Sequence, residues 1–319
     1  MRYDFEMKWL ITGGTGFIGS HVALTFIEAG HDVLVLDQSA AKTHLKIQEF
    51  CPSIIGNICD TSTYIENIRR ANIEGIINLA ALKSVEESKK FPKLYDEVNH
   101  QGTMRLLETA ENLRIKYFIQ SSTAAVYGNN PKGNVSESDV LEPISPYGES
   151  KIDAERALNS FIDRGVLRGT SLRYFNVAGS SRRSLKDTSQ DNLIPKVLLA
   201  ISRNEAPLIF GDDYPTKDGT CIRDYVHVED VARAHLLAAE KLVGNQIAKA
   251  INIGTGTGYS VKEMINALLR NNGSALVPII EKRREGDPAS LTANVDLAKT
   301  EINFSVSKTL QDMVSSSYL

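Results

Sequence analysis

The stretch that decides the fold class is Lys8-Trp9-Leu10-Ile11-Thr12-Gly13-Gly14-Thr15-Gly16-Phe17-Ile18-Gly19. Its first five residues are mostly apolar, the glycines follow directly, and apolar residues recur at helical spacing from His21 to Ala29. Gly30 then offers a favourable helix C-cap. This order predicts a buried strand, a glycine turn and a helix, followed by a second buried strand over 32–37 that ends in an acid.

Three glycines of this turn have separate physical roles in a nucleotide-binding unit. Gly13 permits the tight turn, Gly16 lets the backbone approach a pyrophosphate, and Gly19 packs the helix close to the strand. The anion then rests on unsatisfied N–H groups at the helix N-terminus. Asp37 follows about 20 residues after the turn, where a carboxylate binds the adenosine ribose hydroxyls and repels a 2′-phosphate. The pattern predicts binding of NAD rather than NADP; the alternative is a plain turn with a surface Asp.

Strand-like and helix-like segments alternate as far as Phe175, which predicts an α/β fold with a doubly wound parallel sheet. The expected strands are 53–58, 75–81, 117–120 and 169–175, and the expected helices are 63–70, 92–112 and 152–161. After Asn176, polar and turn residues are more frequent. We therefore expect a dinucleotide-binding Rossmann domain over 1–176, with elements of 222–250 returning to it, and a smaller α/β substrate domain over 177–319.

A second glycine cluster, Gly254-Thr255-Gly256-Thr257-Gly258, invites comparison with the first. No acid follows it at the required distance and it lacks a P-loop lysine, so we interpret it as a turn.

Composition excludes several classes of function. The net charge is −3 over 319 residues and there is no basic stripe, so nucleic acid and anionic membranes are not expected partners. Cys51, Cys59 and Cys221 lack CxxC spacing, which predicts neither a disulfide framework nor a metal site. With no secretory apolar region and no apolar run of about 18 residues, we expect a cytoplasmic protein.

Hydroxyl side chains and a Tyr-x-x-x-Lys pair mark the expected centre of the chemistry. Ser121-Ser122-Thr123 stands at the C-terminal end of a buried strand, where open parallel sheets bind ligands. Tyr147 and Lys151 lie four residues apart on an expected helix and so share one face. An ammonium close to a phenol favours the phenolate, which makes Tyr147 a candidate base near neutral pH. The alternative is a solvated pair on the helix surface.

The chain resembles the extended short-chain dehydrogenase/reductase superfamily and, within it, the UDP-glucose 4-epimerases. The resemblance covers almost the whole length. It rests on the glycine turn, Asn78-Leu79-Ala80-Ala81, Ser121–Gly128, Pro146-Tyr147-Gly148, Leu172-Arg173-Tyr174-Phe175-Asn176, Gly211–Thr216, Asp218-Gly219-Thr220, Arg223–Val228 and Arg283-Arg284-Glu285-Gly286-Asp287.

The resemblance implies an NAD-dependent UDP-hexose 4-epimerase with catalytic residues Thr123, Tyr147 and Lys151. Tyr147 would take the proton of the sugar 4-hydroxyl, Thr123 would bind the reacting oxygen, and Lys151 would hold the nicotinamide ribose. Residues implied to bind NAD are Gly13, Gly16, Phe17, Ile18, Gly19, Asp37, Gln38, Asn57, Ile58, Leu79, Ala80, Ala81, Lys83, Asn99, Ser121, Tyr147, Lys151 and Tyr174. Residues implied to bind the UDP-sugar are Lys83, Thr123, Tyr147, Asn176, Asn192, Leu193, Phe210, Arg223, Tyr225, Arg284, Asp287 and Ser290.

Further expectations follow from the same resemblance. A homodimer would form through helices near Pro92–Asn112 and Tyr147–Phe161. The related 4,6-dehydratases carry Asp-Glu where this chain has Ala124-Ala125, whose methyl groups supply neither the acid nor the base that elimination needs. Ser290 falls, within one residue, at the position that walls the sugar pocket, so a small side chain there predicts room for N-acetylhexosamines.

Two other functions stay open. One is a dehydrogenase or reductase of the same superfamily that releases NADH, and the other is a non-catalytic NAD-binding regulator. Gln38 and Asn57 stand where the family commonly has Asn and Asp, which affects the expected affinity for NAD.

Overall fold

A seven-stranded parallel sheet forms the centre of the computed structural model, which describes residues 6–38, 47–189, 191–284 and 286–317. Its strand order is β11-β7-β5-β4-β1-β2-β3. The strands are β1 (Lys8–Thr12), β2 (Asp32–Asp37), β3 (Ser53–Ile55), β4 (Gly75–Asn78), β5 (Tyr117–Thr123), β7 (Arg168–Tyr174) and β11 (Ala250–Ile253). The order reverses direction at β1, between β2 and β4, and crevices at such switch points hold ligands in open α/β sheets. The predicted α/β doubly wound fold is confirmed.

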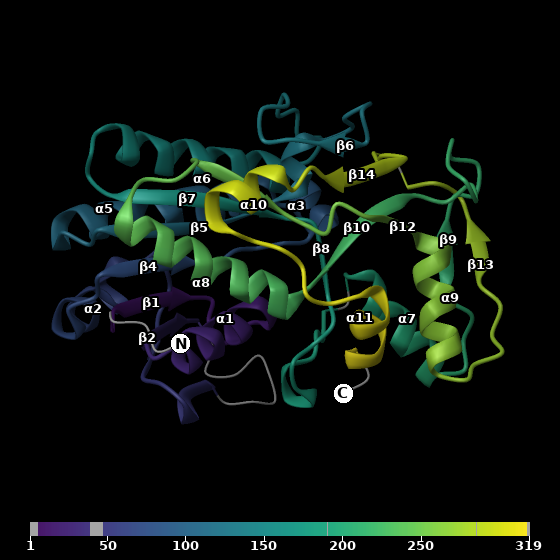
Figure 1. The fold of residues 1–319 in the computed structure, drawn as a ribbon, viewed down its shortest axis with the longest axis horizontal. Coiled ribbons are helices and arrows are strands. Elements are labelled where there is room, and N and C mark those ends of the chain that lie inside the picture. Colours follow the sequence, from purple (N-terminus) through teal and green to yellow (C-terminus); the bar gives the residue numbers. More distant parts are fainter. Residues whose placement is uncertain (1–5, 39–46, 190, 285, 318–319) are drawn as a thin grey trace.

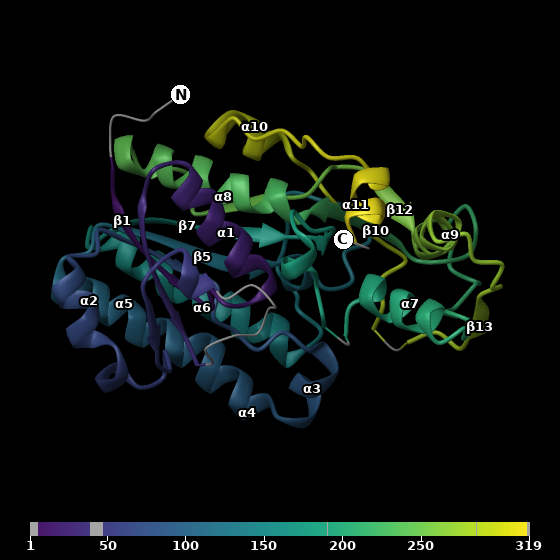
Figure 2. The same cartoon turned by 90° about the horizontal axis from the view of Figure 1, so that it is seen from below.

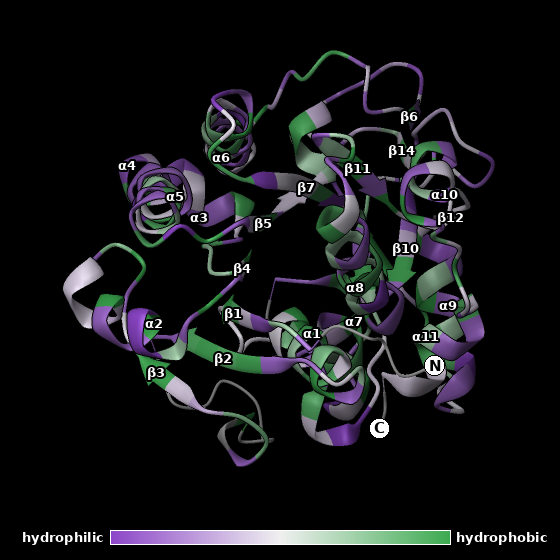
Figure 3. Ribbon diagram, turned by 60° about the vertical axis from the view of Figure 1, so that its left-hand side comes forward, coloured by the Kyte–Doolittle hydropathy of each residue, from purple (hydrophilic) through white to green (hydrophobic). Residues whose placement is uncertain are grey.

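Helices cover both faces of this sheet (Figure 1 and Figure 2). One face carries α1 (Phe17–Glu28), α8 (Val228–Gly244) and α10 (Asp296–Ile302), and the other carries α2 (Ile65–Ala71), α5 (Gly102–Leu113) and α6 (Pro146–Asp163). Because the strands are buried on both sides, they read as apolar runs, and Figure 3 shows β1 and β2 in hydrophobic green. None of the described helices is long and apolar enough to cross a membrane.

A smaller lobe, built mostly from the second part of the chain, lies beside the C-terminal ends of the strands (Figure 1). Its sheets are β12-β10-β14-β6, with β8 also paired to β10, and the two-stranded pair β13-β9. These strands are β6 (Asn134–Val135), β8 (Asn176–Ala178), β9 (Leu208–Phe210), β10 (Ile222–His227), β12 (Gly258–Ser260), β13 (Ile279–Glu281) and β14 (Ser290–Ala293). Helices α7 (Leu193–Ser202), α9 (Val261–Asn271) and α11 (Leu310–Ser316) share its apolar core.

The long helix expected over 92–112 is interrupted. After α3 (Val85–Lys90) come α4 (Pro92–Tyr95), a π-helical segment η3 (Asp96–Gln101) and then α5. The π segment contains Asn99, whose Nδ2 donates to the Leu82 carbonyl and to Ser150 Oγ, both at 3.0 Å. Short 3₁₀ turns complete the described elements: η1 (Ile47–Glu49), η2 (Thr61–Thr63), η4 (Ala124–Tyr127) and η5 (Arg183–Leu185).

The chain returns to the first sheet after building part of the lobe. Strand β11 pairs with β7 at the sheet edge, and α8 packs on α1. The division at residues 176 and 177 remains a prediction, although the placement of β11 and α8 agrees with the idea that elements of 222–250 return.

Candidate active site

One large cavity of about 830 Å³ lies where the C-terminal ends of the strands meet the smaller lobe. Its wall draws on both parts of the chain, so one concave space spans the expected cofactor and substrate regions. The predicted site residues that line it are Gly13, Gly16, Phe17, Ile18, Gly19, Asp37, Gln38, Ile58, Leu79, Ala80, Ala81, Lys83, Ser121, Thr123, Tyr147, Lys151, Tyr174, Asn176, Asn192, Leu193, Phe210, Arg223, Tyr225, Arg284 and Asp287.

The glycine turn forms a cradle that has no room for side chains. Gly13 has φ +67°, and a Cβ there would stand 2.8 Å from the Ala80 nitrogen. A Cβ on Gly19 would stand 2.2 Å from the Gly13 carbonyl oxygen. The N-cap of α1 is Gly16, which supplies no side-chain acceptor, and the first turn holds no acid. The N–H groups and the positive end of α1 thus face the cavity in a form suited to a pyrophosphate.

Asp37 ends β2 beside this turn. Its Oδ2 accepts hydrogen bonds from the Thr15 N–H at 3.2 Å and from Thr15 Oγ1 at 2.6 Å. The carboxylate is therefore fixed at the cavity wall, and Gln38 lines the wall next to it. This geometry fits the ribose-binding acid of a dinucleotide site.

A buried polar network fixes the loop after β4. Asn78 Oδ1 accepts from Thr12 Oγ1 at 2.6 Å, and its Nδ2 donates to Thr103 and Gln120, each at 3.0 Å. Thr12 Oγ1 in turn accepts from the Ala80 N–H at 3.2 Å. These bonds hold Leu79, Ala80 and Ala81 against the glycine turn and explain why polar residues stand in otherwise apolar strands.

Lys151 and Thr123 flank Tyr147 at the C-terminal end of β5. The Lys151 ammonium is buried and donates to Ser121 Oγ and to the Ser121 carbonyl, both at 3.1 Å. Burial lowers the pKa of Lys151 to about 8, against an opposing effect of the Glu155 charge. Helix α6 brings Tyr147 and Lys151 to one face, and its N-cap Ser145 accepts from the Gly148 N–H at 3.2 Å.

The expected lowering of the pKa of Tyr147 by Lys151 is not seen among the protein's own groups and stays a prediction. Desolvation raises the pKa of Tyr147, and only a hydrogen bond with Thr123 opposes it. The reason is geometric, because the Lys151 ammonium points to Ser121. Removal of water from the phenol therefore outweighs the effect of its neighbours.

Glu155 and Arg173 form a buried support behind the catalytic strand that sequence reasoning missed. The two side chains make a bidentate pair at 2.9 and 2.6 Å, and Glu155 also accepts from Ser122 Oγ at 2.5 Å. Arg173 continues to Tyr127 at 2.9 Å, and Tyr127 to Asn252 at 2.7 Å. In the sequence, Glu155 looks like surface charge on a helix, and the only available signal was its place one turn after Lys151 on the same face.

Two arginines reach the cavity from the smaller lobe. Arg223 bonds Asp287 at 3.2 Å and the Pro288 carbonyl at 2.7 Å, which holds its guanidinium at the wall. The Arg284 guanidinium lies over the Phe210 ring, 3.8 Å from the ring centroid. Planar guanidinium groups of this kind suit a diphosphate. Glu285 of the quoted motif lies outside the described residues.

Three predicted site residues do not line the cavity. Asn99 supports the Leu82 loop from behind, and Asn57 accepts from the Cys59 N–H at 2.9 Å. The Ser290 side chain packs against Gly133 instead: a Cβ built on Gly133 would lie 3.2 Å from it. Side chains alternate along a strand, and the neighbour of Ser290 that faces the cavity is Leu291.

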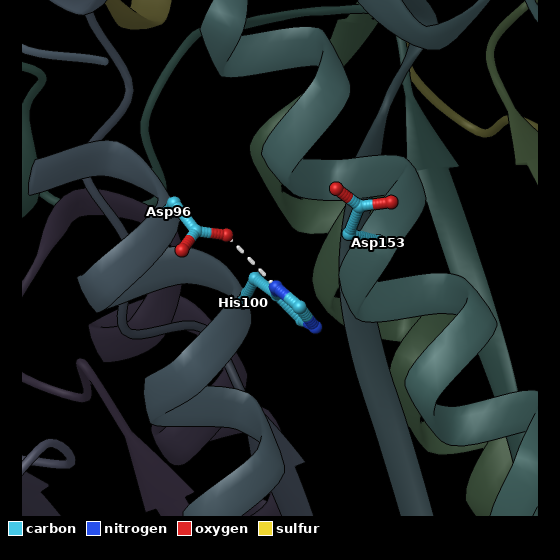
Figure 4. A group of neighbouring side chains, drawn as sticks. All are labelled: Asp96, His100 and Asp153. Carbon is cyan, nitrogen blue, oxygen red and sulfur yellow. Dashed lines mark hydrogen bonds and ion pairs between the residues drawn. The ribbon is translucent and has the colours of Figure 1, made fainter. Parts of the chain in front are cut away.

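Asp96, His100 and Asp153 place ligand atoms within 4.8 Å of one another on η3 and α6 (Figure 4). Within this cluster His100 Nδ1 bonds Asp96 at 2.8 Å, and Asp153 pairs with Arg156 at 2.9 Å. Ion pairs between neighbouring helical turns account for the arrangement.

Comparison with known proteins shows which family the chain resembles. Residues 9–254 match the NAD dependent epimerase/dehydratase family. A UDP-glucose 4-epimerase of Halalkalibacterium halodurans is 40% identical over 298 residues, which cover 92% of this chain and 89% of the relative.

Solved structures agree with this placement. UDP-glucose 4-epimerase from Stenotrophomonas maltophila, with bound NAD and formylated UDP-arabinopyranose, has a TM-score of 0.93 at 32% identity, covering 98% of this chain and 97% of that one. The UDP-Glc/GlcNAc 4-epimerase from Campylobacter jejuni has a TM-score of 0.86 at 33% identity, covering 98% of both chains. The chain therefore belongs to the NAD-dependent epimerase/dehydratase family, as its resemblance to the UDP-glucose 4-epimerases predicted.

Proposed function

We propose that this chain interconverts the C4 epimers of a UDP-hexose, UDP-glucose and UDP-galactose first of all. The observation that carries the proposal is the single cavity. It joins the glycine turn, the group Thr123, Tyr147 and Lys151, and the two arginines. A dinucleotide and a nucleotide sugar can therefore meet at the tyrosine.

In this proposal Tyr147 exchanges the proton of the sugar 4-hydroxyl, and Thr123 bonds the phenol and the reacting oxygen. When bound, NAD supplies the hydride acceptor for sugar C4 and a positively charged ring that favours the phenolate. The arginines and Asp287 hold the UDP part, which leaves the hexose free to present either face. Ala124 and Ala125 add no acid or base at the reacting sugar, so dehydration is not expected.

Sugar analysis tests the activity. Purified protein is incubated with UDP-glucose, UDP-galactose, UDP-GlcNAc and UDP-GalNAc without added NAD, and the products are separated. Tyr147→Phe is expected to lower kcat by about 1000-fold, the usual scale for removing a general base. Stoichiometric accumulation of NADH would point instead to a dehydrogenase. Undiminished biological function of Tyr147→Phe would point to a regulator.

We further propose that Leu291, not Ser290, walls the sugar pocket and leaves room for an N-acetyl group. Leu291 is buried at the cavity wall and packs in one apolar cluster with Ala124 and Phe175. Leu291→Tyr is expected to lose turnover of UDP-GlcNAc while it keeps turnover of UDP-glucose. Equal loss of both would overturn the assignment, and Ser290→Tyr serves as the control beyond the wall.

A homodimer in the cytoplasm is our inference for the state of the protein. Phe91 and Leu94 lie three residues apart beside α6 and are 55% and 46% exposed, so they present apolar surface next to the helices expected at the interface. Sedimentation analysis of wild type and Phe91→Glu tests this interface. Three free cysteines suit a reducing compartment.

A further inference from the structure

Parts of the segment that follows β8 line the cavity. Gly179 and then residues 186–189 and 191–193 line the wall on the substrate side. Its first turn, at Ser180 and Ser181, is held by side chains that are distant in the sequence. One of these comes from α1, the helix whose N-terminus faces the dinucleotide end of the cavity.

His21 makes this connection from α1. Its Nδ1 lies 2.8 Å from the Phe17 carbonyl oxygen, and its Nε2 lies 3.1 Å from the Ser181 nitrogen. A carbonyl can only accept, so Nδ1 carries the hydrogen and Nε2 accepts from the Ser181 N–H. Only the neutral ring in this one tautomer makes both bonds. Burial lowers the pKa of His21 to about 4, which keeps the ring neutral at physiological pH.

The preceding backbone N–H, that of Ser180, is bound by a residue of α11. Ser180 N–H donates to Ser316 Oγ of α11 at 3.1 Å, and His227 Nε2 lies 3.0 Å from the same oxygen. His227 Nδ1 accepts from the Glu229 N–H at 3.1 Å, so its Nε2 donates to Ser316. Two consecutive backbone N–H groups are thus anchored to different elements, and only the His21 anchor belongs to the cofactor helix.

Phe17 completes the connection because it lines the cavity and its carbonyl binds His21. A ligand that contacts Phe17 on the first turn of α1 would restrict the Phe17 carbonyl and, through the two hydrogen bonds of His21, the Ser181 N–H. We propose that His21 is a positioning residue that couples the dinucleotide subsite to the UDP-sugar subsite. The proposal rests on the proposed function for the identity of the two ligands. Such coupling is reciprocal, so each ligand retains the other.

The test uses the holoenzyme and four variants, three of which change a histidine. His21→Leu removes both bonds at similar size, and His21→Gln restores an amide oxygen for the Ser181 N–H. His31→Phe is the control, since His31 also accepts a backbone N–H, that of Met7 at 3.4 Å, and packs on Phe26, and neither of these partners lines the cavity. The readouts are kcat and KM for UDP-galactose, and the rate of cofactor loss with and without UDP.

In wild type, UDP is expected to slow cofactor loss by about five-fold or more. His21→Leu should abolish this effect and raise KM by about five-fold, with kcat changed by less than about two-fold. His21→Gln should restore most of the effect of UDP on cofactor loss and bring KM back toward the wild-type value. His31→Phe should match wild type in both. Ser316→Ala offers a second variant that leaves α1 intact: it should raise KM while UDP still slows cofactor loss.

A folded His21→Leu protein with wild-type KM and a wild-type response to UDP would overturn the proposal. So would a His21→Gln protein that is as impaired as His21→Leu, or a Ser316→Ala protein that loses the response to UDP. Failure of the proposed function looks different, because wild type itself would then turn over no UDP-hexose. In that case calorimetric titration of UDP into wild type and His21→Leu still measures the coupling.

Discussion

Two glycine-rich turns in this protein have similar sequences, but one is open to the cavity and the other is occupied by a side chain of the protein itself. The turn Gly13–Gly19 opens its helix N-terminus to the cavity without a side-chain cap. The turn Gly254–Gly258 is filled by the protein's own carboxylate. Asp224 is buried and accepts from the Thr255 N–H at 2.8 Å, the Gly256 N–H at 2.9 Å and the Ala293 N–H at 3.1 Å.

The difference teaches that glycine supplies exposed N–H groups but does not decide which anion they bind. In the first turn, Asp37 approaches from the side and bonds Thr15, so the helix N-terminus stays open to a ligand. In the second, Asp224 lies within the turn and takes the place that a phosphate would need. The interpretation of Gly254–Gly258 as a structural turn therefore has a physical cause.

The largest expected effect comes from filling the first turn. Gly19→Ala would place a Cβ 2.2 Å from the Gly13 oxygen, and backbone atoms cannot move aside cheaply. We expect a cost of about 4 kcal/mol, enough for about 1000-fold weaker binding of the cofactor. The cofactor content of the purified protein measures it. Wild-type cofactor content in Gly19→Ala would mean that the cradle is not where the dinucleotide binds.

Removing the internal anion of the second turn should affect folding but not the cofactor. Asp224→Asn turns one acceptor oxygen into a donor that faces N–H groups, at a cost of about 3 kcal/mol in unfolding free energy. Urea denaturation measures this loss, and absorbance of the folded fraction reports its cofactor content. A folded Asp224→Asn protein that has lost its cofactor would show that the second turn also serves the dinucleotide.

Acid should loosen the first turn through His21. Its pKa is about 4 in the folded protein, against the ordinary histidine value of 6.5, so the unfolded chain binds more protons between these two pH values. The stability from a neutral His21 is therefore present above pH 6.5 and decreases as the pH falls toward 4, by about 2 kcal/mol at pH 5.

His235, with its pKa also lowered to about 4 by burial, adds a similar dependence away from the turn. Nearby Arg182 and His227 oppose protonation of His21, and Glu229 favours it. Denaturation of wild type and His21→Gln at pH 7.5 and pH 5 isolates the contribution of His21. An unchanged pH dependence in His21→Gln would contradict it.

The smallest effect is expected at Gly256. Its φ of +74° is strained for alanine, but a Cβ would meet Val295 at 3.4 Å and the Ala293 carbonyl oxygen at 3.6 Å, which are ordinary contacts. Gly256→Ala should cost about 1–2 kcal/mol of stability from backbone strain and leave cofactor content unchanged. A loss of cofactor as large as that of Gly19→Ala would remove the distinction between the two turns.

Sequence reasoning reaches the sheet and the glycine turn because both depend on local patterns. Apolar runs predict the strands, and the distance from Gly13 to Asp37 predicts their meeting at the cavity. Sequence reasoning does not find the buried pair of Glu155 and Arg173, because no local pattern indicates that a charged residue on a helix pairs with one on a strand in the core. The π segment around Asn99 has no sequence pattern that separates it from a regular helix.

Two differences between the expected site and the structure have equally specific causes. Matching a sequence motif can locate a position only to within one residue. On a strand that uncertainty matters, because neighbouring residues point to opposite faces and only one of them faces the cavity. The sequence motif therefore expects the wall of the sugar pocket at Ser290, within one residue, and in the structure Leu291 lines the cavity. For Tyr147, helical spacing predicts that Lys151 lies nearby on the same face, but the direction of the ammonium depends on Ser121 of another element.

The return of the chain to its first sheet has a consequence for synthesis. Strand β7 ends at Tyr174, and its outer neighbour β11 begins only at Ala250. At roughly 5–20 residues per second, the ribosome needs about 4–15 s to deliver that neighbour. Throughout this interval β7, a strand of seven residues, lacks the partner that covers its outer side in the finished sheet, and an unpaired strand of this kind is a site for aggregation. Translation speed between these two strands should therefore influence the yield of native protein.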